Sequence, residues 1–263
     1  SISVIAQNPL DLIYKMLDSI SSMKTASYEL YVCEQIDNDL KCSSCKVKLS
    51  VNPFQLYLKV ISPDSGTEVL YTGLEKKALV NPSSFPFINM YLDPYGKLMR
   101  RGQHHTIMNS GFSNFKSIIE KFLPLISKNI ERSLFLLGDS EINGRIYTHI
   151  RILNPEFKKL KYIIKEGETI QSVSDSLGLN AYWIFKENRL KDLFSTNIGD
   201  EIVIPNSYAE RVDIWIDKET GLPLIQKVYF NEELYEHYEF RNIKINKKFS
   251  SLEFSPDYDD YGF

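Results

Sequence analysis

The chain has 263 residues, a formal net charge of −3 and 43% hydrophobic residues. A chain of this length can hold one large domain and one small domain. The slightly acidic balance argues against a nucleic-acid partner, because phosphate binding requires a basic surface. No run of eighteen consecutive apolar residues occurs, so a transmembrane helix is not expected.

The first third of the chain predicts one helix followed by an antiparallel meander. Leu10, Ile13, Leu17 and Ile20 recur at helical spacing. From Tyr28 onward the apolar period changes to two, and short strands alternate with turn residues as far as position 81. Short strands joined by close turns favour antiparallel pairing.

The three cysteines favour a structural disulfide. Cys42 and Cys45 form a C-x-x-C pair beside a predicted hairpin and away from a helix start, so a thioredoxin-like redox site is not expected. Cys33 and Cys42 could instead meet across the hairpin, and the sequence does not choose between these pairings. Either disulfide indicates an oxidising compartment, with one thiol left over.

A second helix is predicted at residues 114–129, and Pro124 inside its apolar stripe should kink or end it. Strands resume at residues 134–137 and 146–153. His104 and His105 follow the polar residues 100–103, which predict a solvated turn. Neither histidine has a nucleophile or metal partner at a recognisable spacing.

Catalytic patterns are missing from the sequence. It has no G-x-S-x-G, no G-x-G-x-x-G and no Walker loop. His149 and His237 fall inside strand patterns, and neighbouring carboxylates such as Glu232 and Glu233 point apart and cannot flank a glycosidic bond. Zinc would need a second ligand pair, and none of the four histidines has the spacing. We therefore predict a protein that is not an enzyme and has no metal or cofactor.

Residues 162–205 predict a small β-α-α-β module. Thr169 suits an N-cap, apolar residues follow it at helical spacing, and Gly178 suits a left-handed helix end. A second short helix is predicted at residues 181–188. Gly199 then permits a turn into a last strand that ends at Pro205.

This segment resembles the LysM domain of bacterial cell-wall proteins. Residues 165–170 (KEGETI) stand where the family has a Gly-Asp-Thr-Leu turn, the second helix ends near Asn188, and residues 198–205 (IGDEIVIP) match the family's closing pattern. The resemblance implies binding to N-acetylglucosamine-containing glycans such as peptidoglycan or chitin.

The family's glycan groove lies between the loop after the first strand and the loop before the last strand. Glu168 departs from the family's usual aspartate; it keeps the charge and lengthens the arm. Carried onto this sequence, the resemblance implies these glycan-binding residues: Gly167, Glu168, Thr169, Ile170, Asn197, Ile198, Gly199 and Asp200.

The rest of the chain carries a second resemblance. Residues 215–223 (WIDKETGLP) are similar to the W-x-D-x-x-T-G-L-P hairpin of LolA-like envelope proteins, and the order of helix, meander, helix and further strands agrees. The resemblance predicts an α+β fold, a half-barrel of antiparallel strands wrapped around helices. Residues 1–158 and 207–263 would form this discontinuous LolA-like domain, and residues 159–206 the inserted LysM domain. Short joints predict that the module is held rigidly.

These observations predict an exported, periplasmic or outer-envelope protein. Residues 2–6 could be the remainder of a cleaved signal peptide. The LolA resemblance implies an apolar cavity for lipid or lipoprotein acyl chains. The alternative is a structural scaffold or protein-interaction module, in which the 15 Phe and 16 Tyr fill a solid core.

Overall fold

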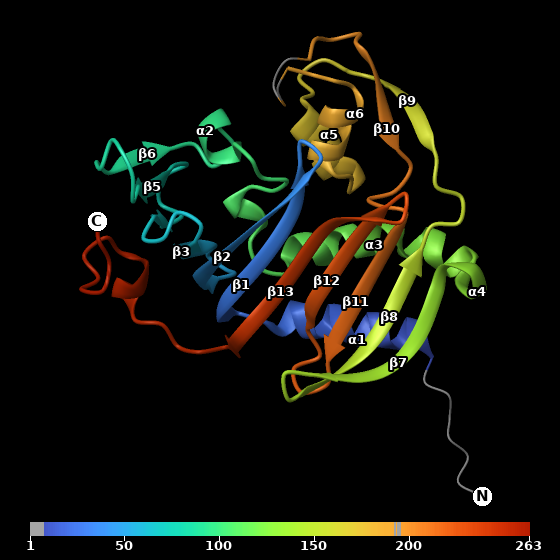
Figure 1. The fold of residues 1–263 in the computed structure, drawn as a ribbon, viewed down its shortest axis with the longest axis horizontal. Coiled ribbons are helices and arrows are strands. Elements are labelled where there is room, and N and C mark those ends of the chain that lie inside the picture. Colours follow the sequence, from blue (N-terminus) through green and yellow to red (C-terminus); the bar gives the residue numbers. More distant parts are fainter. Residues whose placement is uncertain (1–7, 192, 194–195) are drawn as a thin grey trace, which may run out of the picture. The chain divides into compact units, whose positions relative to one another are not determined.

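The computed structural model describes residues 8–191, 193 and 196–263 (Figure 1). The predicted signal-peptide remainder at residues 2–6 lies outside the described residues. The chain divides into two compact units. Unit 1 comprises Ser1–Ile20 and Phe112–Leu234, and unit 2 comprises Ser21–Gly111 and Tyr235–Phe263. Among the described residues, no helix has the length and apolar character needed to cross a membrane.

Unit 2 is built on the predicted antiparallel meander, with strand order β6-β5-β4-β3-β2-β1-β13. In the long β1/β2 hairpin, the turn residues Asp37 and Asn38 both have positive φ, as a two-residue hairpin turn requires. The strands are β1 (Thr25–Ile36), β2 (Asp39–Ser50), β3 (Gln55–Ser62), β4 (Glu68–Tyr71), β5 (Ala78–Asn81), β6 (Met90–Leu92) and β13 (Glu233–Ile245). Three short helices, α2 (Lys97–Arg100), η1 (Ile107–Asn109) and η2 (Ser251–Phe254), complete the unit.

The cysteine pairing that the sequence left open is resolved in the β1/β2 hairpin. Cys33 and Cys42 are direct cross-strand partners and form a disulfide. Cys45 is buried and free. Position 45 lies three residues beyond Cys42 on β2, so its side chain leaves the opposite face of the strand.

The C-terminal segment of unit 2 packs onto its sheet. The ring of Tyr261 stacks on the ring of Tyr57, with 3.6 Å between centroids and 9° between planes. The Gly262 N–H donates to Glu68 Oε2 at 2.6 Å, and Asn81 Nδ2 donates to the Gly262 carbonyl at 2.8 Å. The tail therefore covers part of a small apolar core.

Unit 1 packs helices on antiparallel strands in the order β12-β11-β8-β7 (Figure 1). Side chains on one face of these strands, including Ile150 and Ile214, are fully buried. Gly221, in the turn between β11 and β12, has φ +70°, and a Cβ there would lie 2.4 Å from Ser19 Oγ of α1. The first helix therefore passes close against this hairpin. These elements are α1 (Pro9–Ser22), α3 (Ser113–Lys128), α4 (Ile130–Ser133), β7 (Leu134–Ile142), β8 (Arg145–Leu153), β11 (Arg211–Asp217) and β12 (Pro223–Phe230).

The helix predicted at residues 114–129 is confirmed as α3. Pro124 lies inside it, and the helix continues to Lys128, so the proline does not end it. The carbonyl that loses its helical donor belongs to Glu120, an exposed residue. Water can satisfy that carbonyl, which explains why the helix tolerates the proline.

The predicted β-α-α-β module is present in unit 1. Its elements are β9 (Lys159–Ile163), α5 (Ile170–Leu177), α6 (Ala181–Glu187) and β10 (Glu201–Pro205), and β9 pairs antiparallel with β10. Thr169 Oγ1 accepts the Ser172 N–H at 3.1 Å, and Gly178 is left-handed at φ +71°. The predicted N-cap at Thr169 and the predicted left-handed helix end at Gly178 are therefore confirmed. The predicted fold class is confirmed: antiparallel strands with helices packed on them and an inserted β-α-α-β module. The division at residues 159–206 stays a prediction.

Candidate functional site

The two predicted glycan-binding loops lie side by side in the inserted module. The first runs from β9 into α5, and the second precedes β10. The Gly199 N–H donates to the Ile164 carbonyl at 2.8 Å, and the Ile164 N–H donates to the Asp200 carbonyl at 3.0 Å. These bonds extend the β9/β10 pairing into the loops and bring the predicted residues to one end of the module.

The two acidic residues of the predicted site shape their own loops. Glu168 Oε2 accepts the Lys165 N–H at 2.9 Å, and the Tyr162 hydroxyl donates to Glu168 Oε1 at 2.8 Å. The bond from the Lys165 N–H and then the bond from Tyr162 hold the pKa of Glu168 below its ordinary value. Asp200 Oδ2 accepts the Asn197 N–H at 2.7 Å. The longer side chain of Glu168 therefore stabilises its own loop, because its carboxylate reaches both the Lys165 N–H and the Tyr162 hydroxyl.

The predicted residues differ in their access to solvent. Ile170 is fully buried, so it cannot contact a sugar directly. Ile198 is 69% exposed. Gly167 and Gly199 have φ values of +76° and +87°, and nothing lies within 4 Å of a Cβ built on either. The face thus offers an aliphatic side chain between two stretches of open backbone. Exposed predicted residues are Gly167, Thr169, Asn197, Ile198 and Gly199, and Glu168 and Asp200 are half-buried.

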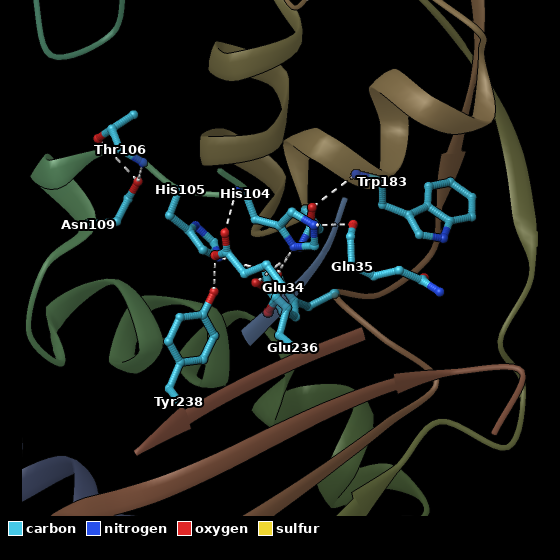
Figure 2. Close-up of polar contacts among 11 residues, drawn as sticks. Glu34, Gln35, His104, His105, Thr106, Asn109, Trp183, Glu236 and Tyr238 are labelled. Carbon is cyan, nitrogen blue, oxygen red and sulfur yellow. Dashed lines mark hydrogen bonds and ion pairs between the residues drawn. The ribbon is translucent and has the colours of Figure 1, made fainter. Parts of the chain in front are cut away.

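A second candidate site lies in unit 2, around a histidine that the sequence placed in a solvated turn (Figure 2). That prediction is wrong for His104, which is 1% exposed. Its Nδ1 lies 2.7 Å from Glu236 Oε1, and its Nε2 lies 2.9 Å from the Gln35 carbonyl oxygen. A carbonyl oxygen only accepts, so His104 Nε2 carries a hydrogen. The polar run before His104 leads the chain into a buried hydrogen-bonding environment, which local polarity could not indicate.

Glu34 and Tyr238 complete the surroundings of His104 (Figure 2). Glu34 Oε2 accepts the His104 backbone N–H at 2.9 Å, and Glu34 Oε1 accepts the Tyr238 hydroxyl at 2.6 Å. His105 Nε2 lies 3.5 Å from Glu236 Oε1, and the His105 side chain is 24% exposed. The cluster therefore reaches solvent on the side of His105.

Charge and burial oppose each other at this cluster. Burial alone would lower the pKa of His104, but the charge of Glu34 and the hydrogen bond to Glu236 outweigh it and raise that pKa. Burial likewise favours the neutral form of Glu236, but the bonds from His104 and His105 lower the pKa of Glu236 below its ordinary value. Both shifts favour the charged pair, with a proton on His104 and an ionised Glu236.

No local signal in the sequence could have found this cluster. Glu34 and Glu236 are direct partners in the β1/β13 register. His104 is separated from Glu34 by 70 residues and from Glu236 by 132 residues. The cluster is thus created by strand pairing across most of the chain and by the loop that follows α2.

Similarity to known proteins identifies the family. The sequence model of a family described as a protein of unknown function, DUF1571, matches residues 25–166 and 194–263, and the chain belongs to that family. The unmatched stretch inside this range, residues 167–193, contains both helices of the inserted module. A search of curated proteins found no match.

Several solved structures show distant likeness in fold. Lipoprotein LppX of Mycobacterium tuberculosis is 12% identical with a TM-score of 0.44, covering 92% of this chain and 97% of that one. A LolA superfamily protein from Nitrosomonas europaea is 8% identical with a TM-score of 0.35, covering 94% and 97%. A putative outer membrane lipoprotein-sorting protein domain from Vibrio parahaemolyticus is 10% identical with a TM-score of 0.35, covering 94% and 96%. At such scores the likeness carries no argument about function.

Proposed function

We propose that this chain is a non-catalytic cell-envelope protein that binds N-acetylglucosamine-containing glycans, peptidoglycan above all, through its inserted module. The observation that carries the proposal is the joining of the two loops by backbone hydrogen bonds from Gly199 and Ile164. It gathers residues 167–169 and 197–200 at one end of the module, where the LysM resemblance locates the groove.

The chemistry of this face suits a sugar ring. A pyranose has an apolar face of C–H groups and a rim of hydroxyls and amides. Ile198 offers exposed aliphatic surface for the C–H face of the sugar. The exposed backbone at Gly167 and Gly199 offers hydrogen-bonding groups for its hydroxyls and amides. Because Glu168 and Asp200 hold their own loops in shape, the face is organised before a ligand arrives.

The module is fixed to the rest of unit 1, which supports a role in positioning the protein at the wall. Asn206 at the second joint accepts from Lys158 N–H at 3.0 Å and donates to the Glu156 carbonyl at 2.9 Å. Trp183 of α6 stacks on Phe230 of β12, with 5.8 Å between ring centroids. The two joints are therefore hydrogen-bonded to each other and do not form a flexible linker.

The disulfide supports an exported, periplasmic or outer-envelope location. Cys33 and Cys42 are joined in the β1/β2 hairpin. Disulfides persist in oxidising compartments such as the periplasm and are rare in the reducing cytosol.

A pull-down on insoluble peptidoglycan tests the glycan proposal. The unaltered chain should sediment with the polymer. Ile198→Asp should reduce the bound fraction at least about tenfold, because a desolvated carboxylate replaces an apolar contact. The matched control is Ile146→Asp. Ile146 lies on β8 and is 53% exposed, and this variant should bind peptidoglycan as well as the unaltered chain does. Failure of the unaltered chain to sediment, or equal loss in both variants, contradicts the proposal.

A second candidate function is binding of lipid or lipoprotein acyl chains by the remainder of the chain. One observation favours it: in the loop between β5 and β6, Phe85, Phe87 and Ile88 are 86%, 69% and 61% exposed. Large apolar side chains gathered at one exposed loop are typical of surfaces that meet a lipid or another protein. Co-sedimentation with phosphatidylglycerol vesicles, compared between the unaltered chain and Phe85→Ser/Phe87→Ser, tests it. Equal sedimentation of both contradicts lipid binding by this loop and leaves the scaffold alternative.

A further inference from the structure

Two glutamates are forced together in the buried part of unit 2. Glu34 on β1 and Glu236 on β13 are direct cross-strand partners, so their side chains leave the same face of the sheet. Glu236 is fully buried and Glu34 is 8% exposed. Like charges directly opposite each other are destabilising, and burial removes the water that would screen them. Hydrogen-bonding and cationic groups around the pair therefore stabilise it.

The ring of His104 bonds to Glu236. Its two ring nitrogens contact Glu236 Oε1 and the Gln35 carbonyl oxygen, so one positive charge is the most that it brings. The Tyr238 hydroxyl and the His104 backbone N–H also bond to Glu34, but both are neutral donors. His105 approaches the same pair from the partly exposed side.

His105 brings a third ligand group to the same place. One ligand atom each from Glu34, His105 and Glu236 can be chosen so that all three lie within 4.8 Å of one another. In a tetrahedral zinc site with bonds of about 2.1 Å, neighbouring ligand atoms stand roughly 3.4 Å apart. His105 Nε2 already lies 3.5 Å from Glu236 Oε1. The third ligand atom lies within 4.8 Å of the other two.

The surrounding contacts are those that metal ligands usually have. Tyr238 holds Glu34 at 2.6 Å and His104 holds Glu236 at 2.7 Å, so both carboxylates are oriented from outside the site. His105 is the partly exposed member, which gives an ion a path from solvent. Two carboxylates and one imidazole suit a borderline divalent cation such as Zn²⁺.

We propose that Glu34, His105 and Glu236 bind one divalent cation of the zinc class, with His104 and Tyr238 orienting the two carboxylates. Three protein ligands leave a fourth position for water or a ligand group. The ion would lie against both carboxylates and would tie the loop of His105 to strands β1 and β13 within unit 2. This site is independent of the glycan-binding face.

Metal titration of the untagged 263-residue chain tests the proposal. After EDTA treatment and dialysis, calorimetry with ZnCl₂ should give one site per chain. His105→Ala, which alters a partly exposed side chain, should weaken zinc binding at least about tenfold. The matched control is His149→Ala, a partly exposed histidine on β8 of unit 1, which should leave zinc binding unchanged. Equal affinity in both variants, or no zinc bound by the unaltered chain, overturns the proposal.

Cobalt provides a second readout that does not depend on stability. Co²⁺ bound by three protein ligands in tetrahedral geometry should show an intense visible absorption, which Glu34→Gln should abolish and Tyr238→Phe should only weaken. Far-ultraviolet circular dichroism shows whether each variant is folded. A cobalt spectrum identical in Glu34→Gln and in the unaltered chain would place the ion elsewhere and overturn the assignment of its ligands.

Discussion

The substitution Asn188→Asp tests what holds the inserted module together. Asn188 follows α6, and its Nδ2 donates to the Ile184 carbonyl at 2.8 Å and to the Val203 carbonyl at 2.7 Å. Its Oδ1 accepts the Val203 N–H at 2.7 Å. One side chain thus joins the end of helix α6 to strand β10. Aspartate has the same shape but presents an oxygen to the two carbonyls.

The expected loss can be worked from these contacts. Losing both amide donor bonds costs about 1 kcal/mol each, and an ionised carboxylate facing two carbonyl oxygens adds repulsion. Aspartic acid can relieve the repulsion by taking a proton, which at pH 7 costs about 4 kcal/mol for a group with an unfolded pKa of about 3.9. The destabilisation at pH 7 therefore lies between about 2 and 5 kcal/mol.

The pH dependence has a definite sign. The two carbonyls raise the pKa of the introduced carboxyl above its value in the unfolded chain, so the folded module binds more protons. The stability of the variant therefore falls as pH rises from about 4 to 7. At pH 4 the loss should shrink to about 1–2 kcal/mol, because protonation is then almost free of cost.

Trp183 provides the assay, because it lies on α6 and the chain has two tryptophans. In a Trp215→Phe background, urea unfolding followed by tryptophan fluorescence reports on the module. The matched control is Asn143→Asp, the same chemical change in an exposed turn, expected to cost less than about 0.5 kcal/mol. A loss below about 1 kcal/mol at pH 7, or an equal loss at pH 4 and pH 7, refutes the reasoning.

Three further predictions concern other parts of the molecule. Tyr261→Ala removes a stacked ring and should destabilise unit 2 by about 2–4 kcal/mol in urea unfolding. The control Tyr91→Ala, at a site that is 59% exposed, should cost less than about 0.5 kcal/mol. Equal losses in the two variants would contradict packing of the tail. Burial raises the pKa of Cys45 to about 12, so a thiol reagent at pH 8 should label the unfolded chain once and the native chain hardly at all; rapid native labelling would contradict this. Burial lowers the pKa of His149, so NMR should show its ring titrating at lower pH than an ordinary histidine. The folded chain should then lose stability as pH drops through the ordinary histidine range. A titration midpoint above that of an ordinary histidine would contradict this prediction.

The local parts of the fold were predictable because their signals lie within a few residues. The Thr169 cap and the Gly178 helix end depend on hydrogen bonds and backbone angles inside one or two turns. The two loops of the candidate glycan face could be paired through the LysM resemblance, and the bonds of Gly199 agree with that pairing. The burial of Ile170 was not anticipated, because the resemblance marks positions near a groove and does not say which of them point inward.

The sequence by itself determined the helix and strand periods, the chain breaks at glycine and proline, and the inserted module. The tertiary structure alone decided that Cys33 pairs with Cys42 and that His104 is buried between Glu34 and Glu236. The physical reason is the range of the interactions. Caps and periods act between near neighbours, whereas the register of β1 on β13 brings together residues about two hundred positions apart. Charges that look solvated along the chain become a buried, coupled cluster only when that register forms.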